Sequence, residues 1–412
     1  MPQEFEHLFS PIKIGSMTVR NRIYSSPHHP LFIDRQSLLI DDRMVRYWES
    51  KARGGVGMIG TFLTEIHAIK SRDIFSRPGF ADAFAKGAEA VHRHGAKLIA
   101  QVAHSGAQAG GVGLANWAPS AIPVPNNTMK WHVPHEMTIP EIEATVAAFA
   151  HGAAVAKEAG VDGCTIHGSH GYLVAEFMSP YFNRRNDDYG GSFENRMRFP
   201  LEVIKAVRDE VGPDFVVGIR VNSDDFVDGG ITLDDFLKIA PLLVEGGRID
   251  FVNVSVGTYI STATVIDPMY LPLNSFVYCA AAVKQVVDVP VIARGRITDP
   301  VQAEEILANN QADMVSMVRA IIADPDFANK ARDGRSEEIC KCIGCNEGCW
   351  RRATSDLFIG MSQGITCTMN PTIGLEGQPG WLVPIPAEVV KRVMVVGGGP
   401  AGLEAARVAA VR

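Results

Sequence analysis

Phe215-Val-Val-Gly-Ile-Arg-Val221 is the kind of stretch that decides the fold of this chain. It is almost entirely apolar and lacks a strict alternation of apolar and polar residues, which is typical of a parallel strand that is buried on both faces. Seven further stretches before the cysteine-rich region are predicted to be strands: Asn21–Ser26, Val56–Thr61, Lys97–Val102, Gly163–Gly168, Phe251–Gly257, Pro290–Gly295 and Ala312–Arg319.

Amphipathic segments fill the intervals between these strands. Thr138-Ile-Pro-Glu141 has the form of a capping box with proline near the first turn, and it predicts a helix through Ala156 that ends near Gly160. Asp234–Glu245 and Pro300–Ala308 have the same periodicity. Eight successive β/α units predict an α/β fold, a (β/α)8 TIM barrel whose active site lies at the carboxyl ends of the strands. An open doubly wound sheet is the competing architecture, but it would normally carry an early glycine fingerprint.

Composition limits the classes of partner. The chain has 412 residues, of which 46% are hydrophobic and 21% charged, so it can bury a large core in two or three domains. A formal net charge of −7, with no cluster of Lys and Arg interleaved with aromatic residues, argues against nucleic acid as a partner. The acidic start lacks the apolar core of a signal peptide, and nowhere do eighteen apolar residues run together. We therefore expect a cytoplasmic protein that binds a small-molecule substrate and no membrane, and homo-oligomerisation stays open.

Five of the seven cysteines fall within 28 residues, at Cys340, Cys342, Cys345, Cys349 and Cys367. Core packing gives no reason for this clustering, and thiolates select iron–sulfur clusters or zinc over hard cations. The compact spacing followed by one remote cysteine favours an iron–sulfur cluster over the paired Cys-x-x-Cys knuckles of a zinc site. Structural zinc and disulfides are the alternatives, and Cys340 is the candidate for a spare thiol. Cys164 and Cys279, in apolar surroundings, are predicted to be small buried hydrophobes.

A glycine-rich segment ends the chain, after an irregular linker at Gly374–Pro386. Lys391-Arg-Val-Met-Val-Val predicts a short strand that runs into Gly397-x-Gly399-x-x-Gly402 and opens a helix, the context of a dinucleotide-binding fingerprint. The acidic residue that would hold a ribose should lie about twenty residues further on, so we expect a truncated unit. The predicted domains are a barrel at 1–335, a cysteine segment with linker at 336–390, and the first βα unit of a dinucleotide-binding domain at 391–412.

Polar residues cluster at the carboxyl ends of the predicted strands, which in a barrel meet around one pocket. His167 and His170, in Ile166-His-Gly-Ser-His-Gly-Tyr-Leu173, can stabilise an oxyanion that develops on a carbonyl, and the hydroxyl of Tyr172 can deliver a proton. The structural alternative is a histidine that caps the loop and a tyrosine that packs. The other members of the set are Pro27-His28-His29, Gln101, Arg220, Tyr259, Arg294-Gly295-Arg296 and Arg319.

Three of these residues suit a bound flavin nucleotide. Arg220 ends a buried strand, where an unpaired charge is costly, so it needs an anionic or electron-rich partner such as a flavin ring. Gln101 offers an amide to the edge of a heterocycle, or alternatively to a backbone group. Arg319 and the backbone near Gly295 match the place where such barrels bind phosphate, although Arg319 could instead pair with Asp324 or Asp326.

These residues resemble the Old Yellow Enzyme superfamily, and within it the longer NADH:flavin oxidoreductase branch with an iron–sulfur cluster. That branch includes 2,4-dienoyl-CoA reductase, 2-enoate reductases and trimethylamine dehydrogenase. The resemblance covers essentially the whole chain. Its marks are Leu8–Gly15 with Asn21-Arg22, Ile166–Leu173, the long run Ser179–Arg196, the cysteines, and Gly397–Gly402.

The resemblance implies FMN in the barrel mouth, a four-iron, four-sulfur ([4Fe-4S]) cluster beside it, and FAD and NAD(P)H sites only with full-length C-terminal domains. The FMN-binding residues would be Pro27, His28, Gln101, Arg220, Gly295 and Arg319, and Gly397, Gly399 and Gly402 would bind the dinucleotide. The cluster ligands would be Cys342, Cys345, Cys349 and Cys367. His167 and His170 would anchor the substrate, with Tyr172 as proton donor.

The implied activity is NAD(P)H-dependent reduction of an activated C=C bond by hydride from FMN. The alternative enzyme is an amine dehydrogenase or N-demethylase, with Tyr172, Tyr259 and Trp131 as a cage for a cationic substrate. The non-enzymatic alternative is a module that binds flavin and cluster without turnover. Ser26-Pro-His-His29 stands where amine-dehydrogenase members carry a cysteine, which argues against covalent flavin. The seventeen residues between Cys349 and Cys367 exceed the family pattern, so the fourth ligand is the least firmly assigned.

Overall fold

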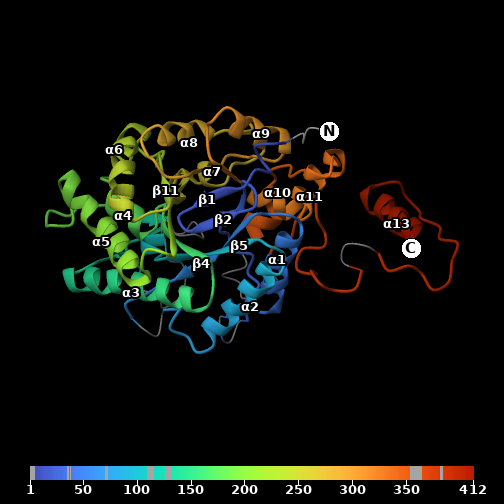
Figure 1. The fold of residues 1–412 in the computed structure, drawn as a ribbon, viewed down its shortest axis with the longest axis horizontal. Helices are drawn as coiled ribbons and strands as arrows, with labels where there is room; N and C mark the ends of the chain where they lie inside the picture. Colours follow the sequence, from blue (N-terminus) through green and yellow to red (C-terminus); the bar gives the residue numbers. More distant parts are fainter. Residues whose placement is uncertain are drawn as a thin grey trace.

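The computed structural model describes residues 5–34, 37, 39–69, 73–108, 116–125, 131–352, 364–380 and 384–412. Its centre is a closed barrel of eight parallel strands (Figure 1). In chain order these are β3 (Ile23–Ser25), β4 (Met58–Glu65), β5 (Lys97–Ala103), β10 (Gly163–Gly168), β11 (Val216–Asn222), β12 (Phe251–Ser255), β13 (Val291–Ala293) and β14 (Met314–Ser316). The pairing of β14 with β3 closes the barrel, so the predicted (β/α)8 fold and all eight predicted strands are confirmed.

Helices surround the barrel, as the periodic segments predicted. The helix α3 (Ile139–Glu158) begins at the predicted capping box, where the Glu141 carboxylate accepts a hydrogen bond from the backbone N–H of Thr138 at 2.8 Å. The others in this part of the described chain are α1 (Asp42–Arg53), α2 (Phe80–His92), α4 (Leu173–Met178), α5 (Phe193–Val211), α6 (Leu233–Val244), α7 (Thr262–Val265), α8 (Val277–Lys284), α9 (Pro300–Ala308), α10 (Val318–Ala323) and α11 (Phe327–Arg332). Among the helices of the described residues, none has both the length and the apolar composition needed to cross a membrane.

Most strand ends differ from the prediction by one or two residues, and the largest differences are in β4 and β14. The strand β4 runs on to Glu65, because an irregularity between Gly60 and Leu63 shifts its pairing with β5 and lets the ladder continue. The strand β14 ends at Ser316, where its short pairings with β13 and β3 end, so Arg319 lies in the helix α10 and not in a strand.

A short hairpin closes the amino end of the barrel. Its strands β1 (Ile12–Ile14) and β2 (Met17–Val19) are antiparallel. Ile14, Met17 and Val19 pack in one cluster with residues from seven of the barrel strands: Tyr24, Met58, Ile99, Val216, Phe251, Ile292 and Met314. The interior is therefore filled from the amino end, and a site has room only at the carboxyl ends of the strands.

Smaller elements lie outside the barrel. After β5 come a parallel pair, β6 (Trp117–Ala118) with β9 (His135–Glu136), and a hairpin of β7 (Val124–Pro125) with β8 (Trp131–His132). The cysteine segment follows α11, and the helix α13 (Pro400–Val411) lies apart from the barrel at the end of the chain (Figure 1).

The strand predicted at Lys391–Val396 is not formed, because no other strand of the described residues pairs with it.

Gly218 tests the packing of the barrel interior. A Cβ atom at this position would lie 2.2 Å from the ring of Phe251, which is fully buried in the register position across from it. We expect Gly218→Ala to lower the free energy of unfolding by about 1–3 kcal/mol through overpacking, measured as a lower midpoint of denaturant unfolding. Gly398→Ala is the control, since a Cβ atom at Gly398 meets no atom within 4 Å.

The double variant Gly218→Ala/Phe251→Leu should recover part of the loss, because a smaller side chain gives the new methyl group room. A Gly218→Ala protein that unfolds at the midpoint of the unaltered chain would contradict this account.

Candidate active site

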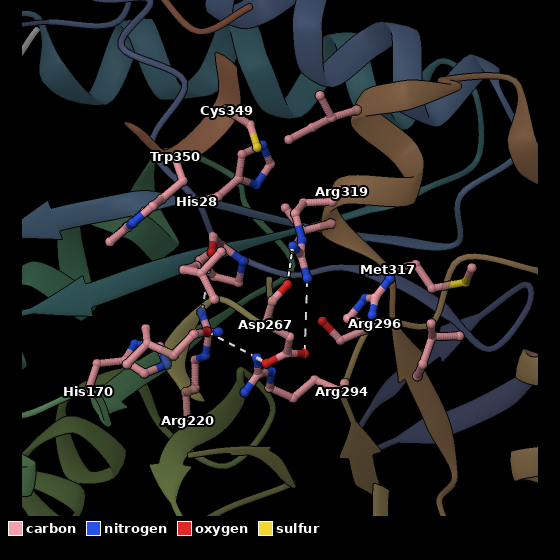
Figure 2. A pocket seen from close by; sticks show the side chains of 18 of the residues that line it. His28, His170, Arg220, Asp267, Arg294, Arg296, Met317, Arg319, Cys349 and Trp350 are labelled. Atoms are coloured by element: carbon pink, nitrogen blue, oxygen red, sulfur yellow. Dashed lines mark hydrogen bonds and ion pairs between the residues drawn. The ribbon is translucent and has the colours of Figure 1, made fainter. Parts of the chain in front are cut away.

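A cavity of about 240 Å³ opens at the carboxyl ends of the barrel strands (Figure 2). Residues from β5, β10 and β11 and from the loops after β3, β10, β12, β13 and β14 line it, so the barrel closure brings together segments that are far apart in the chain. All nine predicted site residues of the barrel line this cavity: Pro27, His28, Gln101, His167, His170, Tyr172, Arg220, Gly295 and Arg319.

Buried polar atoms of several lining residues make no hydrogen bond within the described residues. They include Gln101 Oε1, His167 Nε2, Arg220 Nε, Arg296 Nε and Asp267 Oδ2. A buried polar atom without a hydrogen bond costs about 1–3 kcal/mol, so in native proteins such atoms normally meet a ligand or water. Burial lowers the pKa of Arg220 to about 10, which leaves its guanidinium charged at neutral pH. An acceptor, a ring nitrogen and a cation facing one space fit a polar heterocycle such as the isoalloxazine ring of FMN.

The histidine loop after β10 is held in a strained conformation. His170 has a positive φ of 62°, and its backbone N–H donates to Asn222 Oδ1 at 2.9 Å. Its Nε2 lies 2.7 Å from Ser255 Oγ, and the centroids of the His167 and His170 rings are 5.4 Å apart. Burial lowers the pKa of both histidines well below the usual value, so both rings are neutral at physiological pH. His167 therefore presents an unpartnered ring nitrogen to the cavity, whereas His170 has its Nε2 engaged.

Tyr172 lies beside this pair, with its ring centroid 4.7 Å from that of His167. Its hydroxyl is 3.0 Å from the hydroxyl of Tyr259, and burial raises the pKa of both phenols, so both stay protonated. Tyr259 in turn lies against Trp350, with 6.1 Å between ring centroids. Three aromatic rings thus line one side of the cavity.

Trp131 does not join them. It was expected to help form an aromatic cage, but it lies on β8, is 63% exposed and does not line the cavity. Trp350 occupies the wall instead, and sequence reasoning missed it because its only signal is that it follows Cys349. The reason is topological, since the cysteine segment folds back over the barrel mouth.

His28 lines the cavity with both ring nitrogens already used. Its Nδ1 donates to the backbone oxygen of Ser26 at 3.0 Å, because a carbonyl oxygen can only accept. Its Nε2 therefore accepts, and Tyr47 Oη at 2.7 Å and Lys51 Nζ at 3.3 Å are its neighbours. His28 can contact a ligand with its ring but has no free nitrogen to bind one.

Arginine side chains dominate the opposite side of the cavity. Figure 2 shows Asp267 between Arg294 and Arg319. Arg294 Nη2 lies 2.5 Å from Asp267 Oδ1, and Arg319 donates from Nη1 to the backbone oxygen of Asp267 at 2.6 Å. The alternative pairing of Arg319 with Asp324 or Asp326 is wrong, since Asp324 pairs with Lys330 at 2.8 Å and Asp326 lies 3.9 Å from Arg335. Asp267 is fully buried and was not predicted, although an acid within the apolar stretch Val265–Asp267 was a weak signal.

A second, smaller cavity of about 20 Å³ lies beside the first. All four cysteines that the resemblance assigns to a cluster line it: Cys342, Cys345, Cys349 and Cys367. Cys340 does not, and its Sγ is 3.3 Å from the backbone oxygen of Met369. All seven cysteines are free thiols, so the disulfide alternative is wrong. Within the described part of the chain, no three His, Cys, Asp or Glu side chains converge on a single metal ion, but a four-iron cluster takes one thiolate per iron atom, and four thiols around one space fit that requirement.

The C-terminal glycines lie apart from both cavities. Gly397 has a positive φ of 104°, and Gly399 directly precedes α13. A Cβ atom at Gly402 would lie 1.9 Å from the backbone oxygen of Gly397, so only glycine allows the helix to start this close to the turn. Their predicted role in dinucleotide binding stays a prediction.

Known proteins share this architecture. A "NADH oxidase" of Thermoanaerobacter brockii is 41% identical to this chain, over 99% of this chain and 62% of its own length. An "N,N-dimethylglycine/sarcosine dehydrogenase" of Chromohalobacter salexigens is 39% identical, over 99% of this chain and 59% of its own length. The solved structure of a 2-naphthoyl-CoA reductase in complex with 2-naphthoyl-CoA matches 99% of this chain and 63% of its own with a TM-score of 0.91 and 32% identity. The chain thus spans about three fifths of the length of these relatives.

The family model for NADH:flavin oxidoreductases and NADH oxidases matches residues 7–338, which include the whole barrel and every residue of the cavity that precedes the cysteine segment. Because this match covers most of the chain, the chain belongs to the NADH:flavin oxidoreductase / NADH oxidase family.

Proposed function

We propose that this chain is the substrate- and flavin-binding part of an NAD(P)H-dependent oxidoreductase that reduces an activated C=C bond of an enoate, enone or dienoyl type. The observation that carries the proposal is the convergence of His167, Tyr172, Gln101 and Arg220 on one cavity with unsatisfied polar atoms. Family membership supports flavin-dependent redox chemistry, and the 2-naphthoyl-CoA reductase structure is that of a related reductase.

FMN would be held by residues from both sides of the cavity, and when bound it would supply hydride transfer. Gln101 and Arg220 suit the edge of its ring system, because each has a buried polar atom that makes no hydrogen bond within the described part of the chain. Arg319 suits its phosphate, since this position follows the eighth strand, where such barrels commonly bind phosphate. Pro27, His28 and Gly295 would supply walls and backbone contacts.

The neutral histidines and Tyr172 would act on the substrate. The free ring nitrogen of His167, in its N–H form, can donate to a substrate carbonyl and stabilise negative charge that develops there. His170 holds the loop through Ser255 and Asn222 and limits the space beside the carbonyl. Tyr172 is protonated at neutral pH, so its hydroxyl can deliver a proton to the α-carbon.

The four cysteines around the small cavity would bind a [4Fe-4S] cluster, which when bound would pass single electrons. Cys349 lines both cavities, so such a cluster would lie directly beside the flavin site. FAD and NAD(P)H sites are expected in the part of the longer relatives that this chain does not cover, with the Gly397–Gly402 turn as their first element.

An amine dehydrogenase is the second candidate, and the dimethylglycine/sarcosine dehydrogenase and the Tyr172, Tyr259 and Trp350 rings favour it. Charge argues against it. Four arginines line the cavity, at positions 220, 294, 296 and 319, and Asp267, the one carboxylate among the described lining residues, is paired with Arg294. A cationic amine would therefore enter a cationic site.

Anaerobic mixing separates the functions. We expect a dithionite-reduced sample to be reoxidised by 2-cyclohexenone or cinnamate, whereas dimethylglycine or sarcosine should leave the oxidised flavin unchanged. Flavin bleaching by the amines and no reaction with the alkenes would favour the amine dehydrogenase. Absence of any reaction with either class would favour a binding module without turnover. Flavin absorbance during stopped-flow mixing is the measurement.

Tyr172→Phe tests the proton donor. Loss of the hydroxyl should slow reoxidation of the reduced flavin by an alkene by roughly 10²–10⁴-fold, while the affinity for FMN stays within about twofold because the ring remains. Tyr278→Phe is the control, since Tyr278 is 51% exposed on α8 and is not one of the residues that line the cavity. Equal reoxidation rates in Tyr172→Phe and the unaltered chain would remove Tyr172 from this role.

Cys367→Ala tests the fourth cluster ligand. We expect loss of iron and of the visible cluster absorption, because one of the four thiols of the small cavity is removed. Cys340→Ala is the matched control and should retain both, since Cys340 lies outside that cavity. Iron analysis and absorption spectra of both variants, purified anaerobically, give the answer; full iron in Cys367→Ala would refute the assignment.

A further inference from the structure

The two cavities share a wall. Arg319, Ile322 and Cys349 line both of them, so the proposed phosphate-binding arginine also faces the cysteines. Figure 2 shows Arg319 and Cys349 on the same side of the larger cavity. If one cavity becomes more rigid, the Arg319 guanidinium can therefore become more rigid in the other cavity as well.

Arg319 is held by a residue of the cysteine segment. Its Nη1 donates to Asn346 Oδ1 at 2.7 Å, as well as to the backbone oxygen of Asp267 at 2.6 Å. Nε and Nη2 make no hydrogen bond in the described structure, and Nη2 has the Asp267 carboxylate at 4.0 Å. The side chain is 15% exposed, so two fixed acceptors orient it and leave its remaining donors for an anion.

Asn346 is itself fixed by its place between two of the cysteines. Its side-chain amide donates from Nδ2 to the backbone oxygen of Ile266 at 3.1 Å, so one amide bridges Arg319 and the loop after β12. Its backbone has φ 58° and ψ 8°, a left-handed conformation that asparagine tolerates better than most residues. Cys345 precedes it directly and Cys349 follows three residues later, so anything that fixes these two thiols also fixes Asn346.

A second contact supports the same coupling. Gly344, with φ 73°, passes so close to Arg296 that a Cβ atom there would lie 3.4 Å from the guanidinium. The cysteine segment thus lies against two arginines of the larger cavity, Arg319 and Arg296. In contrast, Asn370, beyond Cys367, anchors the segment to the backbone oxygen of Ile322 at 2.9 Å and makes no hydrogen bond to an arginine of the cavity within the described residues.

We propose that Asn346 is a positioning residue that couples the two cofactor sites, so that a cluster on the four cysteines tightens the binding of the FMN phosphate at Arg319. The physical reason is preorganisation, since an arginine that is already oriented loses less conformational freedom when an anion binds. Binding linkage is reciprocal, so bound FMN must retain the cluster by the same factor. This inference rests on the proposed function, because it takes FMN and the cluster as the occupants.

The test compares FMN and riboflavin on the full chain. The dissociation constant of each is measured by quenching of flavin fluorescence, with the cluster intact and after iron removal by a chelator. We expect iron removal to weaken FMN binding about tenfold, within the range of typical site–site coupling. Riboflavin binding should change less than about twofold, because riboflavin lacks the phosphate that Arg319 would hold. General loosening of the cavity would weaken both ligands alike and would refute the proposal.

Three variants locate the coupling. Asn346→Gly keeps the left-handed backbone and removes the side chain, so the effect of iron on FMN affinity should fall below about twofold. Asn370→Gly removes a neighbouring anchor and should keep the full effect. Asn346→Asp retains an acceptor for Arg319, so it should keep the iron dependence while lowering FMN affinity by partial neutralisation of the arginine. An equal loss of coupling in Asn346→Gly and Asn370→Gly would overturn the role of Asn346.

The outcomes also separate this inference from the proposed function. A purified chain that contains neither iron nor acid-labile sulfide, or that binds no FMN, overturns both the proposed function and the coupling. A chain that holds cluster and FMN but shows the same FMN affinity before and after iron removal overturns the coupling alone.

Discussion

The pairing of β14 with β3 is the contact on which the site depends. It consists of two register pairs, Val315 with Ile23 and Ser316 with Tyr24, and the hydroxyl of Ser316 donates to that of Ser26 at 2.7 Å just beyond them. Because all eight strands are parallel, this closure places every strand end on one rim. Without it, the loop that carries Pro27 and His28 would not meet the helix that carries Arg319.

Burial sets the chemistry of the rim. The interior is filled from the amino end by the hairpin of β1 and β2, and polar groups such as Gln101 and His167 are buried at the other end. There the histidines lose their charge and the tyrosines keep their protons, whereas Arg220 stays cationic. One cavity thereby combines neutral hydrogen-bond donors with cations, which is what the proposed substrate and the proposed anionic cofactor would need.

Local sequence sufficed for the strands and for most of the cavity. Strands buried on both faces give uninterrupted apolar runs such as Phe215–Val221. The polar residues that follow these runs lie at the rim, because the carboxyl ends of all the parallel strands are at the same end of the barrel. It did not suffice for Asp267, Trp350 and Asn346, because their roles arise from contacts between segments distant in the chain, which no local pattern encodes. The prediction that Trp131 helps to form an aromatic cage was wrong for the same reason. The apolar run before Gly397 forms no strand, because a strand needs a second strand to pair with.

The closing strands also set an order of events during synthesis. Ile23 is among the first barrel residues to be made and Val315 among the last, so the barrel interior, including the place where the β1–β2 hairpin packs, is completed only when nearly the whole barrel has left the ribosome. The segment with Cys340, Cys342, Cys345, Cys349 and Cys367 is made after that point. Because Cys349 and Trp350 of this segment line the larger cavity, neither cavity is complete before the segment has been made, and the two sites are finished together.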